Sequence, residues 1–213
     1  MALYIQRWKL NNAFVPIRIY SHFINGAFHH SAPAGDIYGT ELGVLPLADH
    51  LRPCVISANI LLPYIIGAWE HYVKNSYLSI LKYTDVGSKI IKPDKLTAED
   101  LERIRKKEAT VEECIVSRFS FQKPKRIINN FRNLDNNLEI SRVFNEPHEN
   151  LNPGTLIEEA VALRNQIVHE GYINTNCTHE YAINLLNMIE VVADRLYNEI
   201  AKRYGFDTNY DFR

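Results

Sequence analysis

A short polar run near the C-terminal end of the sequence has the clearest potential for chemistry. It reads Arg-Asn-Gln-Ile-Val-His over residues 164–169 and interrupts an apolar segment. Histidine is the side chain that titrates near neutral pH, so His169 could exchange a proton with a reacting hydroxyl or a leaving oxygen. The forked guanidinium of Arg164 suits a phosphate whose charge grows in a transition state. Asn165 could orient the histidine or bind the same phosphate.

The apolar pattern around this run predicts a helix. On a helix, Arg164 and His169 point in different directions. At about 100° per residue, Asn165 and His169 share one face, whereas Arg164 lies about 140° away from His169. One chain therefore cannot easily direct both Arg164 and His169 at the same atom. Two copies related by a two-fold axis could do so, which predicts a homodimer with a shared site.

The spacing of Arg and His is not specific on its own. Arg142 and His148 are also close in sequence, but Pro147 forbids a continuing helix between them, so we exclude that pair. For Arg164 and His169 the structural alternative is an ion pair and a helix-end histidine that interacts with the C-terminal dipole. The context is the more specific signal, because a polar Arg-Asn pair interrupts an apolar helix and a second long helix follows it directly. On the residues alone the structural alternative is still favoured.

The pattern of apolar residues predicts helices from residue 55 onward. An apolar stripe at three-and-four spacing runs from residue 55 to residue 80, and Pro63 should bend or split this helix. Thr97 and Asp100 form a capping box that starts a charged helix. Pro124 starts a short helix that reaches Phe131. A polar, Asn-rich loop is expected between that helix and Pro153.

Two long helices are predicted to follow this loop. Asn152 or Thr155 should cap the first of them, and Gly171 should end it. The last helix is expected from near Thr178 to about Tyr204, where Gly205 stops it. No convincing strand occurs after residue 50. The predicted fold class is therefore all-α, a helical bundle.

Residues 1–50 differ from the rest, because glycine and proline punctuate them densely. They are predicted to form an irregular N-terminal extension, with a possible strand or hairpin over residues 14–20. Residues 51–213 are predicted to form the helical domain. The histidines of the extension, at positions 22, 29 and 30, have no carboxylate or cysteine at ligand spacing, so we interpret them as solvated or packing residues.

The composition restricts the class of protein. The 24 basic and 25 acidic residues give a formal net charge of −1, which argues against binding to nucleic acid by bulk charge. The cationic residues 103–107 and Lys123, Lys125 and Arg126 are best explained as solvated surface. Three widely spaced cysteines (Cys54, Cys114, Cys177) favour a reducing, cytoplasmic setting. No signal peptide or membrane span is evident, and no metal or cofactor is expected.

From about residue 55 to residue 205 the chain resembles a HEPN domain, of the stand-alone bacterial ribonuclease and toxin-like branch. Arg164, Asn165 and His169 match the family's motif, and the helix with Ala68-Trp69-Glu70 resembles the acidic helix that faces it. Residues 117–121 and 125–131 resemble the middle helices. The resemblance implies a metal-independent endoribonuclease, often a toxin or antiviral effector, with RNA as substrate and a composite site in a dimer. It makes Glu70 a candidate to hold Arg164 or His169.

The sequence departs from the family at one position. In the branch that is paired with a nucleotidyltransferase antitoxin, a tyrosine stands two residues after the histidine, whereas this chain has Gly171 there and Tyr172 one position later. We therefore expect a different antitoxin or regulatory partner. A second function remains open, a non-catalytic HEPN-like module that dimerises or binds a nucleotide or a partner protein.

Overall fold

The structure is a computed structural model, and it describes residues 6–7, 9–16, 18, 53–81, 83–84, 87–92 and 95–205. These residues are mainly helical and contain no strand, only an isolated bridge between His148 and Leu151. The all-α prediction is therefore confirmed for the described part of the chain. None of the described helices is long and apolar enough to cross a membrane.

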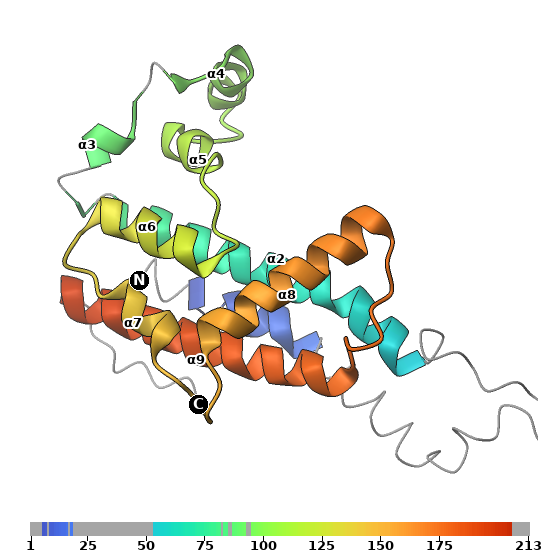
Figure 1. Cartoon of the computed structure of the whole chain (residues 1–213). Coiled ribbons are helices and arrows are strands. Elements are labelled where there is room, and N and C mark those ends of the chain that lie inside the picture. Colours follow the sequence, from blue (N-terminus) through green and yellow to red (C-terminus); the bar gives the residue numbers. More distant parts are fainter. Residues whose placement is uncertain are drawn as a thin grey trace, which may run out of the picture.

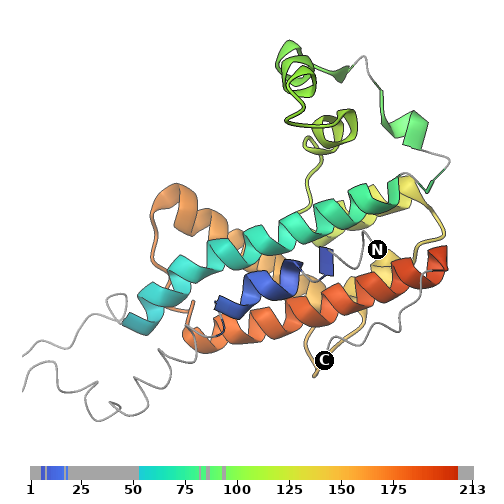
Figure 2. The same ribbon diagram turned by 180° about the vertical axis from the view of Figure 1, so that it is seen from behind.

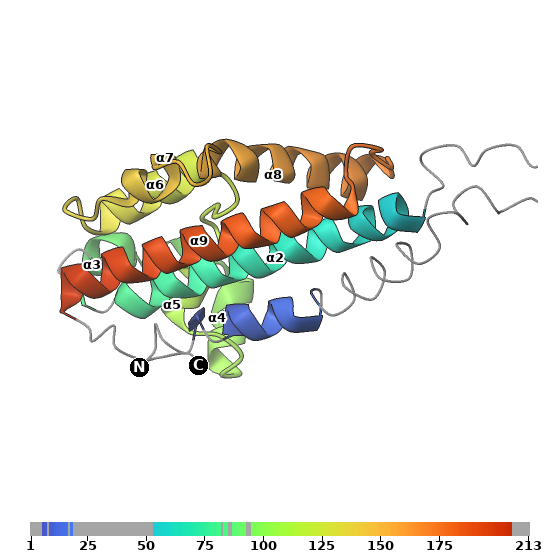
Figure 3. The ribbon, with the colours of Figure 1, turned by 90° about the horizontal axis from the view of Figure 1, so that it is seen from below.

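Two long helices form the centre of the molecule. α2 (Pro53–Leu81) and α9 (His179–Tyr204) lie side by side and run in the same direction (Figures 1 and 3). The buried Tyr72 joins them, because its Oη donates a hydrogen bond of 3.0 Å to the carbonyl oxygen of Ala193. Trp69 and Tyr72 are among the largest fully buried side chains, so the middle of α2 lies deep in the core.

Pro63 does not divide α2, which continues through it without interruption. Proline removes one backbone hydrogen bond, the one that would reach the carbonyl of residue 59. The residues on both sides of it, Leu62, Ile65 and Ile66, are fully buried and hold the helix in place. The expected split is therefore not observed, because core packing outweighs the loss of one hydrogen bond.

A second layer covers the α2–α9 pair. It contains α6 (Pro124–Leu134), α7 (Ile140–Asn145) and α8 (Pro153–Glu170), which follow one another along the bundle (Figure 3). α6 starts at Pro124, as predicted. α7 lies inside the segment that was expected to be a loop, so that prediction was wrong there. The helix forms because Ile140, Val143 and Phe144 are spaced to bury one face against the core.

Three short helices form an arm that stands off one side of the bundle (Figures 1 and 2). They are α3 (Gly87–Ile90), α4 (Ala98–Arg105) and α5 (Val111–Val116). The capping box of Thr97 and Asp100 is confirmed at the start of α4. A second capping box, formed by Thr110 and Glu113, starts α5 and was not predicted. Two N-terminal capping boxes within 14 residues explain where these two short helices begin.

The ends of the last two helices agree with the sequence. Of the two candidates for the cap of α8, Asn152 is the N-cap, and its Oδ1 accepts a hydrogen bond of 3.0 Å from the amide of Thr155. Gly171 and Gly205 end α8 and α9 with φ of +63° and +66°, the left-handed conformation that glycine adopts without strain. Thr178 caps α9.

The N-terminal extension contains a helical segment where a strand was expected. Residues 9–16 and residue 18 are helical, so the strand prediction for residues 14–20 is corrected over its described positions. Leu10 and Phe14, one helical turn apart, are buried in the core, and Arg7 forms an ion pair of 2.7 Å with Asp194 of α9. Contacts with a distant helix therefore decide the local structure. Residues 19–52, with the three histidines discussed above, lie outside the described residues.

Candidate functional site

The run of residues 164–169 lies in the last two turns of α8. The first half of this helix faces the core, where Ile157, Ala160 and Val161 are fully buried. Further along, the side chains are partly or fully exposed, and residues 168–170 are all exposed. The end of α8 projects from the bundle in Figure 1. The packed half of α8 therefore fixes the direction of the helix and presents its polar end to solvent.

Arg164 is a partly buried cation without a carboxylate partner among the residues that the structure describes. Its Nη1 donates a hydrogen bond of 3.0 Å to Oδ1 of Asn165. Its Nε is buried and has no hydrogen-bond partner among the described residues. The ion pair that the structural alternative requires is therefore not formed with a described residue. An unmatched donor on a partly buried guanidinium favours the binding of an anion.

His169 is exposed on the last turn of α8, four residues after Asn165. The amide oxygen of Asn165 accepts the hydrogen bond from Arg164, so it is engaged with the arginine rather than with the histidine. Within the described part of the chain, no hydrogen bond to the imidazole of His169 is formed. The ring is thus open to solvent or to a partner molecule.

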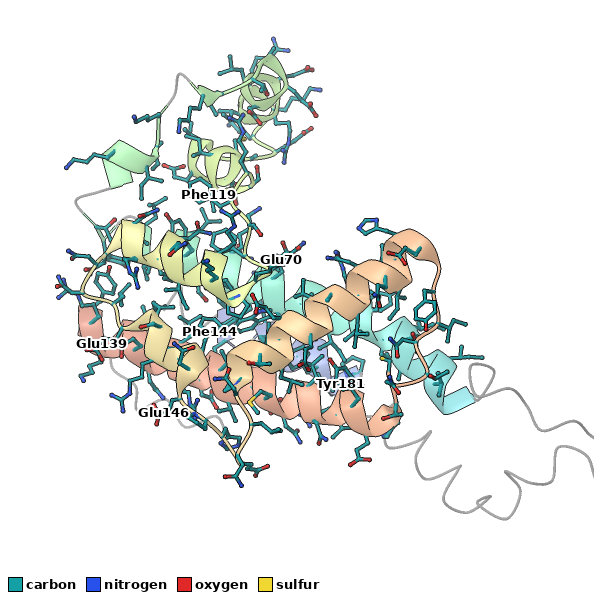
Figure 4. All side chains as sticks on the ribbon, in the orientation of Figure 1. Glu70, Phe119, Glu139, Phe144, Glu146 and Tyr181 are labelled. Carbon is teal, nitrogen blue, oxygen red and sulfur yellow. The ribbon has the colours of Figure 1, made fainter. Side chains whose placement is uncertain are left out.

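Glu70 lies on α2, near its junction with α6 rather than at the free end of α8 (Figure 4). Its Oε2 accepts a hydrogen bond of 3.3 Å from Nε2 of Gln122. It forms no ion pair with Arg164 or His169, both of which are described residues. The suggestion that Glu70 holds either residue during catalysis thus stays a prediction, and the contact with Gln122 gives Glu70 a structural role.

Asn59 holds the loop that follows α8, a role that was not predicted from the sequence. Its Oδ1 accepts a hydrogen bond of 2.8 Å from the amide of Asn174, and its Nδ2 donates to the carbonyl of the same residue over 2.9 Å. The same Nδ2 also donates to the carbonyl of Val55 over 2.8 Å. Asn59 is 3% exposed, and both the oxygen and the nitrogen of its buried side-chain amide have hydrogen-bond partners. The available signal was an amide inside the most apolar stretch of this helix.

The end of α8 and its loop expose apolar side chains around His169. Val168, Tyr172 and Ile173 are 49%, 51% and 36% exposed. Two large apolar residues of α2, Ile60 and Tyr64, are also exposed, and Ile60 follows Asn59, which binds the same loop. Apolar residues that are exposed together around a polar motif are typical of a surface that another molecule covers.

Gly171 explains the absence of a tyrosine at the position that the family resemblance singled out. Its φ of +63° is a left-handed conformation, in which a bulky side chain is strained. Tyr172 is exposed in the loop instead. The backbone that ends α8 at this position therefore requires glycine rather than an aromatic residue.

Tyr181, in the first turn of α9, lies between α8 and α9 (Figure 4). Its hydroxyl is buried and has no hydrogen-bond partner. Burial raises the pKa of Tyr181 well above its usual value, and the nearby Cys177 and Glu159 act in the same direction. Burial also raises the pKa of Cys177 to about 11, so this free thiol is held in its protonated form. Neither group is poised to act as a nucleophile.

No group of three or more His, Cys, Asp or Glu residues in the described part of the chain is placed to hold a metal ion. Residues 56–202 match the sequence profile of the RiboL-PSP-HEPN family, which spans all described helices from α2 to α9 except the first turn of α2 and the end of α9. No curated protein and no solved structure shows significant similarity to the chain.

Proposed function

Because the chain belongs to the RiboL-PSP-HEPN family, we propose that it is an endoribonuclease whose active site forms where the free ends of two α8 helices meet. The observation that carries the proposal is Arg164. It is a partly buried cation that no described carboxylate neutralises, on the same helix as an exposed histidine. A site that must bind a phosphodiester needs such a cation, and a purely structural arginine would normally have an acidic partner.

The proposed reaction uses a nucleophile that RNA itself supplies. The ribose 2′-oxygen forms a bond to phosphorus, and the bond from phosphorus to the 5′-oxygen breaks. The 2′-hydroxyl loses a proton and the leaving 5′-oxygen gains one, and His169 is the residue suited to these transfers. Arg164 stabilises the charge that grows on the phosphate oxygens. The products are a 2′,3′-cyclic phosphate and a 5′-hydroxyl, and the reaction needs no metal.

The dimer follows from the divergence of Arg164 and His169 on α8. Both residues lie in one continuous helix, five positions apart, so a single copy presents them in different directions. A two-fold axis near the end of α8 would bring Arg164 of one copy toward His169 of the other. The exposed Val168, Tyr172 and Ile173 supply apolar area for such a contact.

Product analysis tests the proposed chemistry. Purified protein is incubated with a labelled RNA, with the same RNA methylated at the scissile 2′-oxygen, and with DNA of the same sequence, each with EDTA and, in parallel, with magnesium. We expect cleavage of the unmodified RNA alone, with cyclic phosphate ends detected by mass spectrometry. A magnesium-dependent product with a 5′-phosphate would show that another mechanism operates.

The biological setting that we propose is a toxin or antiviral-defence effector that a partner protein controls. Toxicity on expression, lost in His169→Ala, would support this setting. The alternative is a non-catalytic module that dimerises or binds a nucleotide through the same surface. The hydrogen bond between Arg164 and Asn165 and the apolar residues near them would also suit such an interface. Dimers without any cleavage would favour this alternative.

A further inference from the structure

The segment that leads into and through α6 is basic, whereas the whole chain has nearly equal numbers of basic and acidic residues. Residues 114–134 contain five cations and no aspartate or glutamate, whereas the whole chain has a formal net charge of −1. The five cations are Arg118, Lys123, Lys125, Arg126 and Arg132. A local concentration of positive charge is the usual electrostatic footprint of a nucleic-acid contact.

α6 buries its apolar side chains in the core and exposes its cations to solvent. Ile127, Phe131 and Leu134 of α6 are buried, whereas Lys125, Arg126, Asn129, Arg132 and Asn133 are all exposed. Arg126 and Arg132 are six residues apart, or about 9 Å along the helix axis. The exposed face of α6 thus combines cations with amide side chains, the donors that proteins use for phosphate and sugar oxygens.

The cations of α6 and of its N-cap residue are not paired within the part of the chain that the structure describes. Lys123, Lys125, Arg126 and Arg132 form no ion pair with any residue that the structure places. Several other arginines do form such pairs: Arg118 with Asp100, Arg142 with Glu146 and Arg203 with Asp135. The charge of α6 is therefore open to an external anion.

A hollow of about 410 Å³ lies at the C-terminal end of α6. Arg132, Asn133, Tyr83, Arg203 and Tyr204 are among the residues that line it. Among the described residues that line it, the one acid is Asp135, which pairs with Arg203 at 2.7 Å and accepts a hydrogen bond from Tyr204. Among the described lining residues, Arg132 thus leaves an unmatched positive charge. The ring of Tyr83, which lies 6.5 Å from that of Tyr204 between centroids, is 53% exposed. Such a combination suits a phosphate together with a stacked base.

We propose that the exposed face of α6 binds the phosphate backbone of a single-stranded RNA, with one base in the hollow beside Tyr83. The inference rests on the proposed function, since it takes RNA as the substrate. α6 and α8 lie in the same layer of the bundle (Figure 3), so RNA held on α6 lies on the layer that carries the cleavage motif. Glu158 and Glu159 are exposed on the first half of α8, which limits the backbone contact to α6.

The test measures binding separately from cleavage. A fluorescein-labelled single-stranded RNA of 20 nucleotides is titrated with the full chain carrying His169→Ala, and anisotropy is recorded at several salt concentrations. In this background we compare the double variant Lys125→Gln, Arg126→Gln with the control Arg103→Gln, Arg105→Gln. The control removes the same charge from exposed positions on α4 that form no ion pair with a described residue.

The α6 variant should weaken binding about tenfold at 0.1 M salt and lower the salt slope by about 1.4, or about 0.7 for each lost phosphate contact. The control should change affinity by less than about twofold. Tyr83→Ala should weaken RNA binding further without changing the salt slope. Equal losses in the α6 and α4 variants would overturn the proposal, as would tighter α6-dependent binding of polyglutamate than of RNA.

Cleavage assays distinguish failure of this inference from failure of the proposed function. With His169 intact, the α6 variant should cleave a dinucleotide at the wild-type rate and a 20-nucleotide RNA more slowly. Cleavage of long RNA that is unaffected by the α6 changes would refute the α6 contact alone. RNA binding that depends on α6 without any cleavage would refute the ribonuclease and leave the RNA contact standing.

Discussion

Arg164 donates a hydrogen bond from Nη1 to Oδ1 of Asn165 across 3.0 Å, so two neighbouring residues of α8 act as one polar unit. The asparagine fixes one branch of the guanidinium and leaves the buried Nε without a partner. The arginine is thus oriented but not neutralised.

The first prediction concerns the catalytic pair. Arg164→Ala and His169→Ala should each lower the rate of RNA cleavage by at least about 100-fold, because each removes a group needed only as charge and protons move. Circular dichroism should change little, since both residues lie at the solvent-exposed end of α8. Arg142→Ala and His148→Ala provide matched controls with a similar residue pair elsewhere, and they should cleave normally. Wild-type rates in both motif variants would refute the site.

The second prediction concerns the shared site. An equal mixture of Arg164→Ala and His169→Ala chains, allowed to exchange subunits, should recover about one quarter of the wild-type activity. Half of the dimers are then mixed, and each mixed dimer has one complete site out of two. Light scattering should report a dimer, and Val168→Glu should weaken it. A mixture as inactive as its components would place the site within one chain.

The third prediction concerns Asn59. Asn59→Ala should lower the free energy of unfolding by roughly 2 kcal/mol, because the partly buried backbone amide and carbonyl of Asn174 lose their partner. Hydrogen exchange of residues 171–178 should accelerate as the loop is released. Asn75→Ala is a suitable control, since the side chain of Asn75 donates only to the carbonyl of His71 in its own helix. Unchanged exchange in the loop would show that Asn59 does not hold it.

The fourth prediction concerns Tyr181. Its buried hydroxyl has no partner, so Tyr181→Phe removes an uncompensated polar group at little cost in packing. We expect thermal unfolding at the wild-type temperature or slightly higher, a gain of about 0–1 kcal/mol. Tyr72→Phe is the contrasting variant, because the hydroxyl of Tyr72 does donate a hydrogen bond, and it should destabilise the fold. A clear loss of stability in Tyr181→Phe would mean that the hydroxyl is bonded in solution.

The fifth prediction concerns pH and the arm. Hydrogen bonds from the backbone and side chain of Thr97 hold the pKa of the Asp100 carboxyl below its usual value, and Arg118 acts in the same direction. A lowered pKa in the folded state means that the stabilisation is complete above the unfolded pKa, about 3.9, and is lost as the pH falls below it. The protection factors of residues 98–105, which correct hydrogen exchange for its intrinsic pH dependence, should therefore fall below about pH 4. Asp100→Asn should exchange faster at neutral pH and show less dependence on acid.

Much of the helical layout could be predicted because its signals are local. Thr97, Pro124, Gly171 and Gly205 each start or end a helix through the conformation of one or two residues. The helical segment at residues 9–16 could not be predicted in this way. Its asparagines and Pro16 resemble a loop, and it is held by the buried Phe14 and by the contact of Arg7 with Asp194, 187 residues away.

The candidate site, too, could be predicted from the sequence only where the signal is local. The positions of Arg164 and His169 on one helix followed from their spacing, but the missing acidic partner of Arg164 is a property of the tertiary structure. The contact of Glu70 with Gln122 also depends on how α2 and α6 approach each other, which no periodicity in the sequence encodes.

The hydrogen bond from Tyr72 to the carbonyl of Ala193 has a consequence for how the domain folds. It joins positions 121 residues apart, and α8 packs on both helices that it connects. Contacts so distant in sequence form slowly and late, since the intervening chain must first be brought together. A peptide of residues 153–178 would lack both packing surfaces and lose most of its helix. The motif therefore cannot be isolated as a minimal active fragment or grafted alone onto another scaffold.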